Sequence, residues 1–439
     1  MKSSRVLLAA AVIVLVAVAV SPWLPASAQS STIKIGVLFD HTGPFSAAGS
    51  VNCWRGAKMI IDYVNEKGGV LGKYKIVQVD GDSQSKTEAA INEAERLLNV
   101  EKVDILAGVY SSAHAVPLAE KVDKQKKFLW ITTAIADAVV KDRHLQYTFR
   151  PQPNGGQFGQ FSVQYIASYA PEKLKKAAKD VRVAIIYEDG PYGTGVAAAN
   201  EAEARKQGMT VALKEGYSIQ APDLSSLVTK LRSARPDVLF HTGYNPDIAL
   251  FLRQAKEQGL RVRVYVGHGA GHSQLDKLKE AVGDKEIEGF HTVDPPAAQL
   301  IDPKSYKPGV GEMTAEMVKR YRKEFGEGPI APHVSMGFNN MWVLLNDVLP
   351  RAIQKHGGFG PDALAKAARE TDISEGGTMQ GYGVKFLPPD NAMGGQNERS
   401  FPAVYQVIDG QFRHVWPKTI QSVAPPVLLP RTSPWAVPS

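Results

Sequence analysis

The stretch "TIKIGVLFDHTGPFSAAGSVNCWRGAKMIIDYVNEKGG", residues 32–69, contains a strand, a loop and a helix in the order from which the fold is built. Residues 32–40 are almost continuously apolar, which is typical of a short strand covered on both faces. After the loop, residues 51–69 repeat apolar side chains at helical spacing. The side chains predicted to share one helix face are Trp54, Ala57, Ile60, Ile61 and Val64. Gly68 and Gly69 predict the end of this helix.

The alternation of strands and helices continues along the chain and then starts again. The first series runs to "FLWITT" at residues 128–133, and a second begins with "VRVAIIYED" at 181–189. Strands that alternate with helices predict parallel sheets with both faces covered. We therefore expect an α/β fold of two Rossmann-like lobes. After Gly289 the pattern becomes helical. These helices need a sheet to pack against, and we expect it to be the sheet of the first lobe.

Three passages between the lobes follow from this order, and together they predict a three-strand hinge with a cleft beside it. They are expected near residues 149–153, near 289–296 and before 401–417. The last stretch alternates like a hairpin, with Asp409-Gly410 as the turn pair. The expected division is lobe 1 from 32–149 plus 290–385, lobe 2 from 150–289 plus 386–417, and a proline-rich C-terminal tail, 418–439, which we expect to be extended and poorly ordered.

The N-terminus reads as a cleavable secretory signal, residues 1–28. Lys2 and Arg5 precede an apolar run, and a small-residue site ends at Ala28. The run is shorter than the ~20 residues that a spanning helix needs. Cys53 is the only cysteine and lies inside the mature chain, so neither a lipid anchor nor an internal disulfide is expected. These features predict a periplasmic protein that is not a lipoprotein.

Composition narrows the class of protein. The chain has 439 residues, 44% of them hydrophobic and 22% charged, which suits two globular domains. Its formal charge of +7 falls to +5 once Lys2 and Arg5 leave with the signal, and basic residues are interspersed with acids. Nucleic-acid binding requires a basic patch with stacking aromatic residues. Because the basic residues here are interspersed with acids, nucleic-acid binding is not expected. We expect a monomer without a cofactor.

Several motifs in this order resemble the leucine/isoleucine/valine-binding family. They are "IKIGVLFDHTGPFSAAG", "GAKMIIDYVNEKGGVLG", "ILAGVYSSAHAVPLAE", "FRPQP", "VAIIYEDGPYGTG" and "DVLFHTGYNPDIALFLRQAKEQGL". Members of that family are type I periplasmic solute-binding proteins of ABC importers. The resemblance covers about residues 32–417 and implies a two-lobed clamp, without catalysis, that hands a small ligand to permease subunits in the inner membrane.

The resemblance also implies which residues of lobe 1 contact the ligand. The carboxylate-binding serine loop of the family falls on Ser111 and Ser112, at the end of a strand and the start of a helix, where hydroxyls and free amides make an anion site. The next loop of the family covers Thr132, Thr133, Ala134, Ile135 and Ala136. Ala136 stands where relatives usually carry a hydroxyl.

Pocket aromatics of the family fall on Tyr192 and Tyr244 in lobe 2, where a ring and a hydroxyl suit a lid over a small ligand. His333 replaces an aromatic residue of the family, and Ala48 stands where some relatives carry a large ring. The pocket is therefore expected to be wider at that wall, with Phe45 as the nearby apolar side chain.

"YVGHGAGHSQL", residues 265–275, admits three interpretations. Its glycines miss the dinucleotide spacing because His272 stands where the third glycine belongs. His268 and His272 could hold a metal, but the glycines between them indicate a loop where helical spacing would be needed. We favour the floor of a ligand pocket, with His268 as the polar contact and Gly269 beside it.

Amino-acid binders of the family place an acid in this loop, whereas here no acid occurs before Asp276. Asp247 is the nearest acid from another loop and more simply caps a helix. A buried ammonium without a counter-charge would cost several kcal/mol. The ligand is thus either a branched-chain amino acid held by other groups, or a related organic or aromatic acid without an amine. A periplasmic sensory subunit is the alternative function, and no hydrolase motif occurs.

Overall fold

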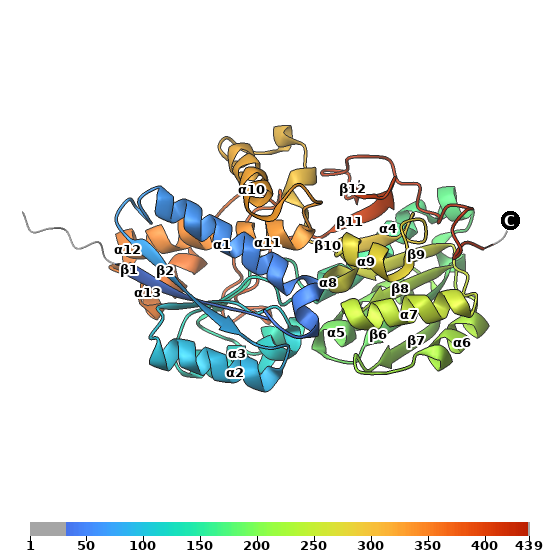
Figure 1. The fold of residues 1–439 in the computed structure, drawn as a ribbon, viewed down its shortest axis with the longest axis horizontal. Helices are drawn as coiled ribbons and strands as arrows, with labels where there is room; N and C mark the ends of the chain where they lie inside the picture. Colours follow the sequence, from blue (N-terminus) through green and yellow to red (C-terminus); the bar gives the residue numbers. More distant parts are fainter. Residues whose placement is uncertain (1–31, 438–439) are drawn as a thin grey trace, which may run out of the picture.

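The computed structural model describes residues 32–437, so the predicted signal peptide, 1–28, lies outside the described residues. Two sheets lie side by side along the long axis of the molecule, each with helices on both faces (Figure 1). We call the elements around the first sheet lobe 1 and those around the second sheet lobe 2. Within 32–437, no helix combines the length and apolar character needed to cross a membrane.

Lobe 1 is built on a five-stranded parallel sheet of order β2-β1-β3-β4-β5. Its N-terminal elements are β1 (Thr32–Phe39), α1 (Val51–Glu66), β2 (Lys75–Asp82), α2 (Thr87–Glu95), β3 (Ile105–Gly108), α3 (Ser112–Lys124), β4 (Leu129–Ile131) and β5 (Thr148–Phe149). Alternate residues of β1 enter different cores. Ile35 and Val37 pack with α1, whereas Leu38 packs with side chains of α3. The predicted end of α1 is confirmed, because Gly68 has a φ of 102°.

Lobe 2 contains a seven-stranded sheet of order β12-β11-β10-β9-β8-β6-β7, parallel except at β11 and β12. Its elements are α4 (Gly155–Tyr169), β6 (Arg182–Glu188), α5 (Pro191–Lys206), β7 (Thr210–Tyr217), α6 (Ser225–Ala234), β8 (Val238–Thr242), α7 (Asn245–Glu257), β9 (Val264–His268), α8 (Gly269–His272), α9 (Leu275–Val282), β10 (His291–Asp294), β11 (Ala403–Ile408) and β12 (Gln411–Trp416). The predicted hairpin is confirmed: Asp409 and Gly410, at φ of 53° and 69°, turn between β11 and β12.

The late helices return to lobe 1, as predicted. They are α10 (Val310–Phe325), α11 (Pro332–Val343), α12 (Leu349–His356) and α13 (Pro361–Arg369). α11 lies against α1, because a Cβ atom added to Gly337 would stand 2.0 Å from the carbonyl oxygen of Cys53. The indole Nε1 of Trp130 donates to the carbonyl of Asn340 at 2.9 Å, which joins α11 to β4. Short helical turns complete the chain: η1 (Ser46–Ser50), η2 (Arg96–Val100), η3 (Asp137–Val139), η4 (Ala170–Leu174), η5 (Ala178–Asp180), η6 (Ala298–Leu300), η7 (Pro303–Ser305) and η8 (Leu344–Val348).

The three crossovers lie together, but two boundaries differ from those expected. Arg150, in the first crossover, pairs with Gln396 in the third, and the Tyr405 hydroxyl donates to the carbonyl of Pro295 at 2.6 Å. β10 pairs with β9, so residues 291–294 lie in the second sheet, although 290 was the expected start of the return to lobe 1. The Phe386 ring packs edge-to-face against Trp130 in lobe 1, so the third crossover comes later than residue 386.

The expectation of a poorly ordered tail is wrong for its described part, residues 418–437. The Trp435 side chain is only 2% exposed, packs against Phe290, and donates from Nε1 to the carbonyl of Glu286 at 2.7 Å. The backbone N–H of Val262 donates to the carbonyl of Trp435 at 2.9 Å. Apolar residues between the prolines, among them Leu429 and Trp435, bury against lobe 2, and that burial orders the segment.

Candidate ligand-binding site

A small cavity lies where the C-terminal ends of strands from both sheets meet, the usual ligand position in open α/β sheets. Its lining residues are Tyr110, Ser112, Thr133, Ile135, Phe158, Tyr192, Tyr244, Gly269, Ala270, Asp294, His333 and Met336. The structure thus brings together seven predicted residues: Ser112, Thr133, Ile135, Tyr192, Tyr244, Gly269 and His333. The cavity volume is about 30 Å³, room for about two water molecules, so the lobes must part to admit an amino acid.

The predicted serine pair begins α3. The buried Oγ of Ser111 makes no hydrogen bond of standard geometry to a described residue, and the Tyr244 hydroxyl is its polar neighbour. The Oγ of Ser112 accepts from the backbone N–H of Ala136 at 3.1 Å and joins the two pocket loops of lobe 1. The first amides of a helix have no partner within the helix and carry a partial positive charge. Ser111, Ser112 and the start of α3 therefore offer unused donors for an anion.

Side-chain hydrogen bonds to its backbone carbonyls fix the loop from Thr132 to Ala136. The Arg150 guanidinium donates from Nη1 to the carbonyl of Ala136 at 2.7 Å, and the Asn340 side chain donates to the carbonyl of Thr132 at 2.8 Å. Arg150 is fully buried, and that burial lowers its pKa to about 10. Thr133 and Ile135 reach the cavity, whereas Thr132, Ala134 and Ala136 are buried behind it.

An aromatic wall closes the cavity from both lobes. The rings of Phe45 in lobe 1 and Tyr244 in lobe 2 have their centroids 4.4 Å apart, and the Tyr192 and Tyr244 rings are 5.5 Å apart. Burial raises the pKa of the Tyr192 and Tyr244 phenols well above the usual value, so both remain neutral donors. Ala48 lies behind this wall, where its carbonyl accepts from the Tyr110 hydroxyl. The small side chain of Ala48 was expected to widen the pocket at this wall, but the Phe45 ring occupies the space beside Tyr244.

The expected polar contact from His268 is wrong. β9 continues through this residue, and its side chain points into lobe 2, where the Nδ1 lies 2.9 Å from the Thr242 Oγ1 and the Nε2 3.1 Å from the Ser162 Oγ. Burial lowers the pKa of His268 to about 3. The loop does face the cavity, but through Gly269 and Ala270. In residues 32–437, no group of three or more His, Cys, Asp or Glu side chains is placed to hold a metal ion.

An acid that the sequence interpretation missed does line the cavity. Asp294 ends β10 and is 2% exposed, and its Oδ2 lies 3.3 Å from the Nε2 of His333. The sequence could have indicated it, because the strand "HTVD" ends at the same edge of the sheet as the strands whose ends were predicted to form the pocket. The expectation for Asp247 is confirmed: its carboxylate accepts from the backbone N–H of Tyr244 at 3.0 Å, at the start of α7. Tyr110, Phe158, Ala270 and Met336 were missed as well.

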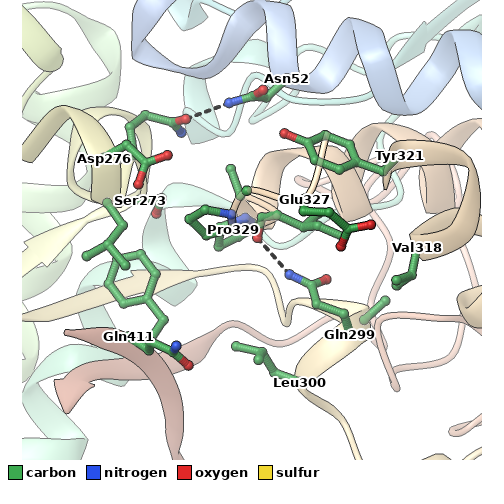
Figure 2. A pocket seen from close by; sticks show the side chains of 18 of the residues that line it. Asn52, Ser273, Asp276, Gln299, Leu300, Val318, Tyr321, Glu327, Pro329 and Gln411 are labelled. Carbon is green, nitrogen blue, oxygen red and sulfur yellow. Dashed lines mark hydrogen bonds between the residues drawn. The ribbon is translucent and has the colours of Figure 1, made fainter. Parts of the chain in front are cut away.

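A second, broader groove lies outside the cavity, between α10, α9 and the turn before β12 (Figure 2). Its lining includes the exposed side chains of Lys277, Lys319 and Lys323. Asn52, labelled in Figure 2, lines this groove, and its Nδ2 donates to the Oε1 of Gln274 at 2.7 Å. The Gln274 amide also reaches the Nδ1 of His333 at 3.0 Å, so Gln274 stands between the groove and the cavity.

Comparison with known proteins gives the family. A family model described as periplasmic binding protein matches residues 32–400. The Leu/Ile/Val-binding protein homolog 7 of Brucella suis is 35% identical over 404 residues, which cover 92% of this chain and 96% of that protein. Homolog 8 of Brucella abortus is 33% identical over 392 residues, covering 89% of this chain and 92% of that protein.

Solved structures agree on the fold. The leucine-binding protein LivK of Thermotoga maritima superposes with a TM-score of 0.70 at 22% identity, covering 87% of this chain and 97% of that one. A Rhodopseudomonas palustris solute-binding protein in complex with benzoate gives a TM-score of 0.70 at 15% identity, covering 90% and 98%. The chain belongs to the periplasmic binding protein family and, within it, to the Leu/Ile/Val-binding proteins, which serve ABC transporters as non-enzymatic substrate-binding components.

Proposed function

We propose that this protein works in the periplasm as a monomer, captures a small solute that bears a carboxylate, and delivers it to the permease subunits of an ABC importer. The ligand lies between the lobes, with its carboxylate at Ser111 and Ser112 and its apolar part against Tyr192 and Tyr244. Branched-chain amino acids and aromatic acids are the candidate ligands. Isoleucine is bound in a structurally similar protein of Streptococcus pneumoniae and benzoate in one of Rhodopseudomonas palustris.

The unpartnered Ser111 hydroxyl carries this proposal. A buried hydroxyl without a partner costs free energy, which a ligand oxygen can recover. Ser111 stands at the N-terminus of α3, a helix of 13 residues, where the amides and the helix dipole also favour an anion. None of the cavity's described lining residues is Lys or Arg, so the hydroxyls and amides would carry anion binding.

Closure of the two lobes would complete the site. Ser112 and Thr133 come from lobe 1, while Tyr192, Tyr244 and Gly269 come from lobe 2, so a ligand contacts both sets only when the lobes are closed. A ligand shifts the population toward the state in which it makes more contacts. The adjacent crossovers at Arg150, Pro295 and Gln396 are the expected hinge for this rotation.

Titration calorimetry on the mature chain tests the anion site. Ser111→Ala combined with Ser112→Ala should weaken binding of the tightest carboxylate ligand by about tenfold to a hundredfold, because a hydrogen bond to a charged group contributes ~1.5–3 kcal/mol. Ser225→Ala is the matched control, since Ser225 also begins a helix, α6, away from the cavity. Unchanged affinity in the double variant would remove the proposed anion site.

Delivery to a permease is tested in cells. Deleting the gene should abolish high-affinity uptake of the ligand that calorimetry identifies, and the wild-type gene should restore it. If uptake persisted while ligand-dependent gene expression was lost, the protein would serve as a sensory subunit.

A further inference from the structure

The Asp294 carboxylate is buried without a Lys or Arg partner among the described residues. No hydrogen bond between residues of the described chain ends on either of its side-chain oxygens, and its buried Oδ2 has no hydrogen-bond partner. Asp294 pairs with Ala403 of β11, so the sheet fixes its backbone while its side chain lines the cavity. An isolated buried carboxylate is costly unless it is paired. An uncompensated acid at the wall of a ligand cavity therefore indicates a group that the ligand supplies.

Among the Lys, Arg and His side chains of the described residues, His333 is the one within ion-pair distance of Asp294. The Oε1 of Gln274 accepts from Asn52, which orients the amide so that its Nε2 donates to the Nδ1 of His333 at 3.0 Å. The Nδ1 therefore accepts, and the Nε2 of His333 lies 3.3 Å from the Asp294 Oδ2. That separation is longer than the ~2.7–2.9 Å of a charge-assisted hydrogen bond.

The rest of the lining favours a cation beside Asp294. Lys and Arg are absent from the described residues that line the cavity, so no permanently charged cation of the protein lies there. The faces of Tyr110, Tyr192 and Tyr244 are attractive to a cation. A nitrogen that carries N–H groups fits better than a quaternary one, because no short hydrogen bond from the described residues ends on the Asp294 Oδ2.

We propose that Asp294, oriented by His333, is the counter-ion for a positively charged nitrogen of the ligand. This inference rests on the proposed function, because the carboxylate of the same ligand would be held at Ser111 and Ser112. The ligand is then a zwitterion, and simple acids without an amine are poor ligands. The acid reaches the cavity from β10, one strand away from the loop at 268–269 in which it was expected.

Contacts that reach Asp294 across the two lobes would link binding of the charged nitrogen to closure of the lobes. Asn52 and His333 belong to lobe 1, and Gln274, between them, belongs to lobe 2. The chain of contacts from Asn52 through Gln274 and His333 to Asp294 is complete only when the lobes are together. A cation at Asp294 would add to contacts that exist only in the closed state.

Calorimetry with matched ligand pairs tests the proposal on the unmodified mature protein. The pairs are L-leucine with 4-methylpentanoate, L-isoleucine with 3-methylpentanoate, L-valine with 3-methylbutanoate and L-phenylalanine with 3-phenylpropanoate. For the tightest pair, the amino acid should bind at least about thirtyfold more tightly than its amine-free partner, as expected when a buried charge loses its partner. Equal or tighter binding of the amine-free acid would overturn the proposal without any variant.

Variants then assign the effect to Asp294. Asp294→Asn keeps the shape and removes the charge. It should bring the two members of the pair within about threefold of each other, mainly by weakening the amino acid. Asp276→Asn is the control, because Asp276 is an exposed acid on the outer groove. Unchanged preference for the amino acid in folded Asp294→Asn would overturn the assignment. Failure of every carboxylate to bind would instead overturn the proposed function.

Discussion

Gln274→Ala should shift the equilibrium between open and closed lobes. The Gln274 side chain is 4% exposed, and its two contacts to lobe 1, 2.7 Å to Asn52 and 3.0 Å to His333, can form only when the lobes are together. Each hydrogen bond contributes a net ~0.5–1.5 kcal/mol. Losing both should therefore disfavour closure by about 1–3 kcal/mol, which is roughly 5- to 150-fold in the closed-to-open ratio.

Small-angle X-ray scattering and calorimetry together measure this effect. Without ligand, Gln274→Ala should have a larger radius of gyration than the wild type. Its affinity for every ligand should fall, because apparent affinity scales with the fraction of competent protein. Gln258→Ala is the matched control, since the hydrogen bonds of its side chain within residues 32–437 go to Ser225 and Thr229, both in lobe 2. Wild-type scattering and affinity in Gln274→Ala would refute the idea that this residue holds the lobes together.

Three further predictions concern stability, each measured by chemical denaturation. Gly337→Ala should destabilise the protein by at least ~1–3 kcal/mol, because the new methyl group would meet the Cys53 carbonyl at 2.0 Å. The control Gly195→Ala, at an open helix position, should be neutral or slightly stabilising. Equal effects of the two substitutions would contradict the close packing of α1 on α11. Burial lowers the pKa of His268 and of His272 to about 3. The unfolded chain therefore binds protons that the folded chain does not, so this stability is complete above about pH 6.5 and is lost as the pH falls toward 3, by up to ~1.4 kcal/mol per pH unit for each group. His272→Gln should make that pH dependence shallower, and an unchanged slope would argue against a buried neutral His272. Truncation after residue 417 should lower stability by ~2–5 kcal/mol, since it exposes the surface that Leu429 and Trp435 cover; an unchanged denaturation midpoint would mean that the tail does not pack in solution.

Hydrophobic pattern was enough to predict most of the fold. Strands such as 32–40 and 181–189 are short apolar runs between amphipathic helices, and β1 and β6 occupy these positions. The helix stop at Gly68-Gly69 and the turn at Asp409-Gly410 were predictable because both require positive φ, which glycine and aspartate adopt more readily than most residues. These features depend on neighbours in the sequence, which is why they could be predicted.

The candidate site was harder to predict because it depends on contacts between distant residues. Ser112, Tyr192 and Tyr244 were found from motifs at strand ends. His268 was misassigned because β9 runs through it, and the alternation of side chains along a strand turned its ring into lobe 2. Asp294 was missed because its place beside His333, 39 positions later, depends on a contact between distant residues, and the strand end at residues 291–294 was not used. The tail was misjudged because proline content said nothing of the burial of Trp435.

A thermal-shift screen of the purified mature protein directly tests whether the ligand is a carboxylate that also carries an amine. Each branched-chain amino acid would be paired with its deaminated acid, and phenylalanine and benzoate added. A ligand that binds only the folded state at a hundredfold over its Kd adds about 2.7 kcal/mol, which gives a clear rise in Tm. We expect stabilisation by at least one amino acid and much less by its amine-free partner. Stabilisation by none of these carboxylates would contradict the proposed function.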